Sequence, residues 1–255
     1  MNNLNQQEFS DYTVLDSHQA SGTGVIAKKF MASVFMWMFV ALGVSTLMAV
    51  LYATTPALTQ ELYQVNEKGR LSPSMLMWVV TFAPFAFLLI MQFGMARLSS
   101  GTLTLLFIAF AAVLGISLSS VLLVYTSGSV IGCFGAASAM FGVMAFMGYT
   151  TDKDLTSFGR LLTMALIGVI VASLINMFIH SNAMGYIISI VGVAVFTGLT
   201  AYDTQKLKRI GAGLEFEGTS ATDTRKLALM GALSLYLDFL NLFLLLLNLF
   251  GNRKD

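Results

Sequence analysis

The sequence is short of charge. Asp, Glu, Lys and Arg make up 11% of its 255 residues, whereas hydrophobic residues make up 56%. A soluble domain usually carries about 25% charged residues, so this chain has too little polar surface to cover a water-soluble globule. Its formal net charge of +1 gives no long-range attraction to nucleic acid. The composition predicts an all-α membrane protein whose partner is the lipid bilayer, with no nucleic-acid partner.

Residues that form disulfides, metal sites and cofactor linkages are also scarce. The single Cys133 excludes an internal disulfide, and its apolar surroundings predict a small packing residue. Neither histidine, His18 or His180, has a second metal ligand at a suitable spacing. No lysine occurs in residues 227–252, which excludes a retinal Schiff base in the last apolar segment. We therefore expect no cofactor and no catalytic residue.

The distances between charged residues predict seven membrane spans. A bilayer core about 30 Å thick needs about 20 helical residues, and two uncharged stretches of 54 and 42 residues each hold two spans. Residues 1–29 are polar, lack the pattern of a cleavable signal peptide and are expected to form a cytoplasmic tail. The transmembrane domain is expected at 30–252. Its spans are predicted at about 30–53, 74–96, 101–125, 129–150, 159–180, 184–205 and 227–250, with a sizeable polar loop at 207–226.

The distribution of Lys and Arg predicts the orientation of these spans. If the N-terminus lies inside, the inner segments hold ten of the fourteen basic residues and the outer segments hold four. Because basic residues are enriched on the cytoplasmic side, we expect a cytoplasmic N-terminus and a C-terminus outside.

Two aspartates lie within the predicted spans. A carboxylate at the centre of a span costs about 2.5–3.5 kcal/mol, so such residues usually face a bundle interior or an aqueous cavity. Asp203 lies near the inner end of the sixth span, and Asp238 lies about ten residues into the seventh. Two like charges about 4 Å apart repel by about 4 kcal/mol at an effective dielectric of 20, so a contacting pair would share a proton and titrate as a unit. Counting along ideal helices places Asp238 deeper than Asp203, so contact requires a tilted or deeply starting seventh helix.

Each of these residues also has a structural interpretation. Asp203 could be an interfacial residue that pairs with a following lysine. Asp238 could be a protonated packing group that hydrogen-bonds to Tyr236 or Asn241. Arg97 closes the second span on the predicted inner side, where it is either an interfacial anchor or a competing partner for the aspartate once the pair loses its proton.

Four sequence blocks are similar to those of a known family of membrane proteins. Gly198-Leu-Thr-Ala-Tyr-Asp-Thr-Gln-Lys-Leu-Lys208 resembles the signature of the Bax inhibitor-1 family (transmembrane BAX inhibitor motif-containing proteins), in its bacterial branch. The last span, Gly231-Ala-Leu-Ser-Leu-Tyr-Leu-Asp-Phe-Leu-Asn-Leu-Phe243, resembles that family's last span. Gly115-Ile-Ser-Leu-Ser119 and Gly148-Tyr-Thr-Thr-Asp-Lys-Asp-Leu-Thr-Ser-Phe-Gly159 resemble two further blocks. The resemblance covers about residues 30–252.

The resemblance implies a fold, a location and a function. The fold is a seven-helix bundle with the last helix central, in a bacterial inner (plasma) membrane. The function is a pH-sensitive calcium leak, with calcium ions and protons as partners. An aspartate pair in the last two spans acts as the pH sensor, which corresponds here to Asp203 and Asp238, and these two carboxylates are also the candidates for a calcium path. Arg97 is the candidate for the arginine that serves as an alternative partner.

Two other functions are consistent with the sequence to different degrees. An intramembrane aspartyl protease also uses two aspartates in adjacent spans, and Tyr202-Asp203 fits its first motif. Its second motif is Gly-x-Gly-Asp, whereas this chain has Leu235-Tyr-Leu-Asp238, so we expect no enzyme. A non-conducting regulator that binds a membrane protease or another partner is the main alternative to the leak channel.

Overall fold

Seven long helices form the body of the protein in a computed structural model that describes residues 24–65, 71–216 and 220–254. Each is long and apolar enough to cross a bilayer, so the expected all-α seven-span fold is confirmed. They are α2 (Val25–Thr54), α4 (Met75–Gly94), α5 (Ser100–Val124), α6 (Ser127–Thr150), α7 (Thr156–Ile179), α8 (Asn182–Phe216) and α9 (Ala221–Phe250). Between α2 and α4 lie the short helix α3 (Pro56–Leu62) and the antiparallel strands β1 (Tyr63–Val65) and β2 (Leu71–Pro73). Residues 1–23 of the expected polar tail lie outside the described residues.

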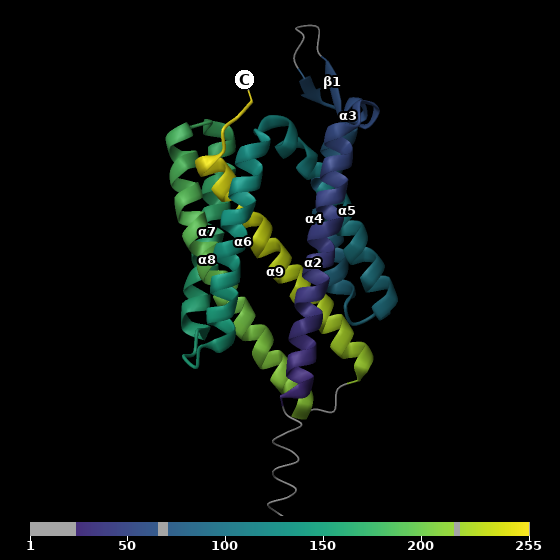
Figure 1. The fold of residues 1–255 in the computed structure, drawn as a ribbon, viewed down its shortest axis with the longest axis vertical. Coiled ribbons are helices and arrows are strands. Elements are labelled where there is room, and N and C mark those ends of the chain that lie inside the picture. The colour runs from purple at the N-terminus through teal and green to yellow at the C-terminus, as the bar shows by residue number, and fades with distance from the viewer. Residues whose placement is uncertain (1–23, 66–70, 217–219, 255) are drawn as a thin grey trace, which may run out of the picture.

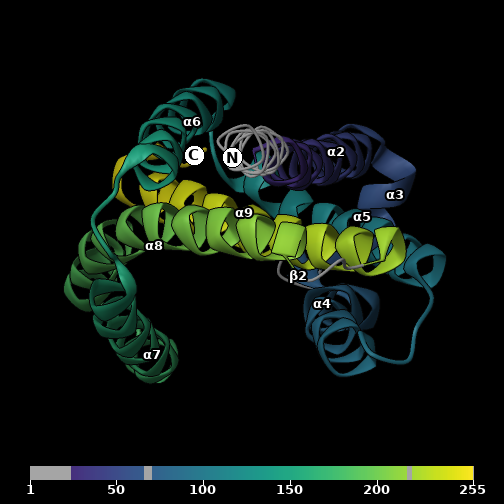
Figure 2. The ribbon, with the colours of Figure 1, turned by 90° about the horizontal axis from the view of Figure 1, so that it is seen from below.

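The last helix, α9, occupies the centre of the bundle. In its apolar stretch 67% of the residues are buried, against 39% or fewer in each of the other spans. It contacts α2, α5, α6 and α8, and it crosses the molecule diagonally (Figure 1). Seen from below, α8 and α9 run side by side through the middle, with α2 and α6 on one side and α4 and α7 on the other (Figure 2). The predicted central position of the last helix is confirmed.

Aromatic side chains fix α9 in this position. Tyr236 packs edge-on against Phe110 of α5, with ring centroids 6.0 Å apart. Phe239 makes similar edge-on contacts with Phe134 and Phe141 of α6, at 5.2 Å and 5.7 Å. A helix that is apolar on all sides is a buried helix, and the Leu- and Phe-rich sequence of α9 meets neighbours around most of its circumference.

The prediction of a polar loop at 207–226 is wrong, because most of this segment is helical. α8 continues to Phe216, eleven residues beyond the expected end of the sixth span, and α9 begins at Ala221. Leu207, Gly211 and Leu214 recur at helical spacing and face the bundle, with both leucines buried. The polar residues between them therefore coat the outer face of a helix. Ser220 caps α9, since its Oγ accepts from the Asp223 N–H at 3.1 Å.

The two ends of the described chain lie at opposite ends of the bundle (Figure 1), as an odd number of spans requires. The C-terminal segment is tied to the turn between α5 and α6. The Thr126 N–H donates to the Asn252 carbonyl at 3.0 Å, and the Asn252 N–H donates to Ser129 Oγ at 2.9 Å. The Lys254 ammonium also donates to the Leu122 carbonyl at 2.7 Å, so the C-terminal end of α9 is held in place.

Candidate functional site

The α8–α9 pair brings the two intramembrane aspartates to similar depths. Asp203 lies thirteen residues before the end of α8, and Asp238 lies seventeen residues after the start of α9. At 1.5 Å per residue these distances are about 20 Å and about 26 Å. They differ by about one helical turn, which a side chain on each helix can span. The expected mismatch in depth disappears because both helices extend well beyond the apolar segments that charge spacing defined.

The carboxyl groups of Asp203 and Asp238 lie close enough to each other to interact. A hydrogen bond between two carboxyl groups requires a proton on one of them. Ser234, one turn before Asp238, donates from its Oγ to Asp203 Oδ2 at 2.7 Å. Asp238 is 6% exposed, and its Oδ2 has no hydrogen-bond partner in the part of the chain that the structure describes. Asp238 therefore depends on Asp203 for its hydrogen bonding.

In the described part of the chain, neither aspartate forms an ion pair with a lysine or a hydrogen bond with Asn241. The Asn241 side chain donates to the Leu237 carbonyl at 2.8 Å rather than to Asp238. Lys208 lies over the Tyr149 ring, 5.3 Å from its centroid. Among the described residues the sole ion pair joins Asp154 to Arg209, so neither Asp203 nor Asp238 pairs with a lysine.

A cavity of about 490 Å³ gives access to one member of the pair. It lies between α4, α8 and α9, and its polar lining consists of Gln92, Asp203, Lys206 and Ser234. Asp238 does not line it. The pair therefore has an accessible side at Asp203 and a sealed side at Asp238.

Arg97 lies just beyond the end of α4, the helix that forms one wall of this cavity. Its side chain is exposed, and it forms no ion pair with Asp203 or Asp238, both of which are described. Arg97 thus lies two residues after Met95, which lines the cavity. Of the three predicted site residues, the structure brings together only the two aspartates.

Sequence reasoning missed the contacts that position Asp203 within α8. A Cβ on Gly148 would lie 2.8 Å from the Ala201 Cα, and a Cβ on Gly159 would overlap the Tyr202 ring. The backbones of α6 and α7 therefore approach α8 closely at the two residues that precede Asp203. These glycines begin and end one of the sequence blocks, and the residues that they meet belong to the α8 signature. The two blocks are thus one packing unit.

The loop between α6 and α7 is docked on α8 by Gln205 and Arg209. The Gln205 side chain is 4% exposed; it accepts from the Leu155 N–H at 2.9 Å and donates to the Lys153 carbonyl at 2.7 Å. Arg209 donates to Asp154 Oδ1 at 2.7 Å. Hydrogen bonds from the Thr156 side chain and backbone, and then from Arg209, hold the pKa of Asp154 well below its usual range. Polar residues on a helix give no sequence signal for such docking.

The aspartate pair is too small a ligand set for a tight metal site. No group of three or more His, Cys, Asp or Glu side chains that could hold a metal ion occurs among the described residues. Calcium takes six to eight oxygen ligands, so two carboxylates with the Ser234 hydroxyl would hold it only weakly. Weak binding is what a permeation path requires.

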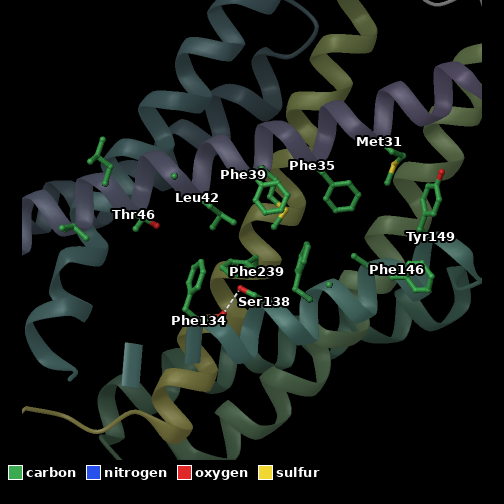
Figure 3. A pocket seen from close by; sticks show the side chains of 17 residues that line it. Met31, Phe35, Phe39, Leu42, Thr46, Phe134, Ser138, Phe146, Tyr149 and Phe239 are labelled. Atoms are coloured by element: carbon green, nitrogen blue, oxygen red, sulfur yellow. Dashed lines mark hydrogen bonds between the residues drawn. The ribbon is translucent and has the colours of Figure 1, made fainter. Parts of the chain in front are cut away.

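A second, larger cavity lies on the opposite side of α9. It measures about 1070 Å³ and runs between α2 and α6, with Phe239 of α9 among its lining residues (Figure 3). No charged side chain lines it, so it offers no ligand to an ion. The titratable part of the site is the cavity on the Asp203 side.

The fold and the buried carboxyl pair define an integral membrane protein of seven helical spans. Comparison with known sequences then identifies its family. The sequence model of the family described as "Inhibitor of apoptosis-promoting Bax1" matches residues 27–255, and the chain belongs to this Bax inhibitor-1 family.

Several bacterial proteins are similar to the chain over most of their length. It is 42% identical over 225 residues to "Inner membrane protein YbhL" of Escherichia coli strain K12, a match that covers 88% of this chain and 92% of that protein. It is 37% identical over 242 residues to an uncharacterized protein of Borreliella burgdorferi, covering 95% and 100% of the two chains. It is 40% identical over 229 residues to an uncharacterized protein of Caulobacter vibrioides, covering 89% and 90%.

Proposed function

We propose that the protein is a pH-sensitive leak channel for calcium whose gate is the Asp203–Asp238 pair. The observation that carries this proposal is the contact between the two carboxyl groups, one facing a polar cavity and the other sealed behind it. In the predicted orientation this cavity opens toward the cytoplasm. Membership of the Bax inhibitor-1 family also supports the proposal.

The shared proton acts as the latch in this mechanism. While it is present, the hydrogen bond holds α8 and α9 together at the base of the cavity. Its loss leaves two anions that repel by about 4 kcal/mol at about 4 Å and an effective dielectric of 20. That repulsion is enough to separate the two carboxylates and to open space beside Asp203. The separated carboxylates then provide oxygen ligands that attract a divalent cation into the path.

Arg97 stabilises the open state in this proposal. It follows α4, which forms a wall of the cavity, so a movement of this end of α4 toward α8 carries the guanidinium toward Asp203. An Arg–carboxylate pair is a strong, charge-assisted contact, and it replaces the hydrogen bond that Asp203 loses when the proton leaves.

Calcium flux into proteoliposomes that contain an entrapped calcium dye tests the gate. We expect the leak of the natural chain to increase as the pH is raised and the shared proton is lost. Asp238→Asn supplies a permanent amide donor to Asp203, so the leak should stay low and lose its pH dependence. The matched control is Asp152→Asn, an exposed aspartate in the loop between α6 and α7, which should behave like the natural chain. A pH dependence that survives in Asp238→Asn would refute the role of the pair.

The non-conducting regulator is the second candidate, and one feature of the surface favours it. The cavity between α2 and α6 is apolar and open at the side of the bundle (Figure 3). Beside it, a Cβ on Gly132, Gly135 or Gly142 of α6 would meet nothing within 4 Å. Small residues of this kind allow close packing of another membrane helix, such as that of a membrane protease. Cysteine crosslinking from Gly135→Cys, combined with no calcium flux at any pH, would favour this function over the channel.

A further inference from the structure

A separate pocket lies at the end of the bundle where α2 and α9 begin side by side (Figures 1 and 2). Its volume is about 650 Å³, and it is distinct from the cavity that reaches Asp203. The polar side chains that line it are Lys29 and Ser33 of α2 and Thr224 and Arg225 of α9. Trp37 is among its apolar lining residues. The pocket is therefore amphipathic, with two cations and several apolar side chains in its lining.

The two cations of this pocket are not neutralised by the described part of the protein. Neither Lys29 nor Arg225 forms an ion pair with a described carboxylate. The nearby carboxylate of Asp223 instead accepts a hydrogen bond from Ser220 Oγ at 2.8 Å, as part of the cap of α9. Arg225 lies over the Trp37 ring, with its guanidinium carbon 5.8 Å from the centroid. This contact holds the guanidinium beside another residue that lines the pocket.

The position of the pocket along the helices matches the boundary of a bilayer. Lys28 and Lys29 are the last charged residues before the uncharged part of α2, and Arg225 and Lys226 are the last before the apolar part of α9. Tryptophan is enriched at this level of membrane proteins, where its ring meets the headgroup region. Basic pockets between helices at the cytoplasmic side are the type of site that binds the headgroups of anionic lipids.

We propose that this pocket binds one anionic phospholipid from the surrounding leaflet. The phosphate lies between the Lys29 ammonium and the Arg225 guanidinium, with the Ser33 hydroxyl as a further donor. The first part of an acyl chain lies against Trp37. A free phosphate ion would use only the cationic half of the pocket and leave its apolar wall uncovered, whereas a phospholipid uses both halves. This site is independent of the aspartate pair and of ion conduction.

Quenching of Trp37 fluorescence by brominated lipids gives a direct test. The chain has two tryptophans, so Trp78→Phe leaves Trp37 as the sole tryptophan reporter. The full chain is reconstituted into vesicles of phosphatidylcholine that contain a small fraction of brominated phosphatidylglycerol or, in parallel, of brominated phosphatidylcholine. We expect the anionic lipid to quench Trp37 at a much lower mole fraction than the zwitterionic one. Equal quenching by the two lipids would overturn the proposal.

Charge variants separate this site from general attraction to a basic surface. One basic residue near the membrane surface strengthens the binding of anionic lipid by about fivefold (about 1 kcal/mol), so Lys29→Gln with Arg225→Gln should reduce the preference by roughly 25-fold. The matched control is Arg253→Gln with Lys254→Gln, which removes the same charge from the opposite end of the bundle. The preference should survive in this control, and an equal loss there would overturn the proposal.

Two further measurements keep the test decisive. Lys29→Arg with Arg225→Lys retains both charges and should retain most of the preference, so a loss confined to the glutamine variant cannot be attributed to these positions being intolerant of change. Inorganic phosphate added to the vesicles should leave the quenching unchanged. If inorganic phosphate displaces the brominated lipid, the pocket is a site for a soluble anion, and the phospholipid assignment is wrong.

Discussion

Gly148 is the point at which α6 meets the backbone of α8, and Gly148→Ala tests how closely the two helices are packed. An added Cβ would lie 2.8 Å from both the Cα and the carbonyl carbon of Ala201, and closer still to its carbonyl oxygen. These are backbone atoms within a helix, so they cannot rotate away as a side chain can. One helix must move. Because Ala201 lies two residues before Asp203, that movement also displaces the aspartate.

The size of the effect follows from two opposing contributions. Overpacking a well-packed interior costs about 1–3 kcal/mol, whereas Gly to Ala within a helix gains up to about 1 kcal/mol from helix propensity. Gly142→Ala in the same helix provides the matched control, since a Cβ there would meet nothing within 4 Å. The propensity contribution is common to both substitutions. The difference between the two variants is therefore the cost of the steric clash, about 1–3 kcal/mol.

Thermal unfolding in detergent micelles measures this difference. The readout is the fraction of protein that stays monodisperse after heating. For chains of about 150–250 residues, 1 kcal/mol shifts Tm by about 2–4 °C, so a clash of about 2 kcal/mol places Gly148→Ala about 4–8 °C below Gly142→Ala. Calcium flux at about pH 5 should also be higher in Gly148→Ala, because the displaced Asp203 no longer meets its partner. Equal Tm values for the two variants would refute the close approach of α6 and α8.

Three further predictions concern the surroundings of the site. Thr156 and then Arg209 hold the pKa of Asp154 below its usual range. The stabilising contribution of Asp154 is therefore present at neutral pH and is lost only as the pH falls through that depressed pKa. Asp154→Asn should leave the pH dependence of calcium flux between about pH 5 and about pH 8 unchanged. Gln205→Ala removes two hydrogen bonds to the docked loop and should lower the free energy of unfolding by about 1–3 kcal/mol in a denaturant titration. Cys133 is 6% exposed and should react with maleimide far more slowly than a cysteine in the exposed loop between α6 and α7, introduced as Asp152→Cys in a Cys133→Ser background.

The spacing of charged residues predicted the number and order of the spans but not the lengths of their helices. A charge marks the place where a segment leaves the apolar part of a bilayer, whereas a helix ends only where its backbone hydrogen bonds end. Lys206, Lys208 and Arg209 therefore ended the predicted span but lie within α8, which continues to Phe216. The depth of Asp203 was misjudged for this reason. Asp238 was identifiable because no charged neighbour surrounds it in the sequence, whereas Ser234 belongs to a residue type that occurs throughout membrane helices without a specific role.

The packing of the helices also indicates which part of the bundle can move when the pair separates. α8 is fixed by the close approach of Gly148 and Gly159 and by the loop docked on Gln205. α9 is buried at the centre, and the C-terminal segment beyond it is tied to the turn between α5 and α6. By contrast, α4 packs chiefly against α5, although it forms one wall of the cavity at Asp203. Moving α4 disturbs the fewest contacts between spans, and the same movement changes the position of Arg97 relative to Asp203. We therefore expect α4 to be the helix that rearranges when the Asp203 and Asp238 side chains separate, with α8 and the aspartate that it carries as the stationary side.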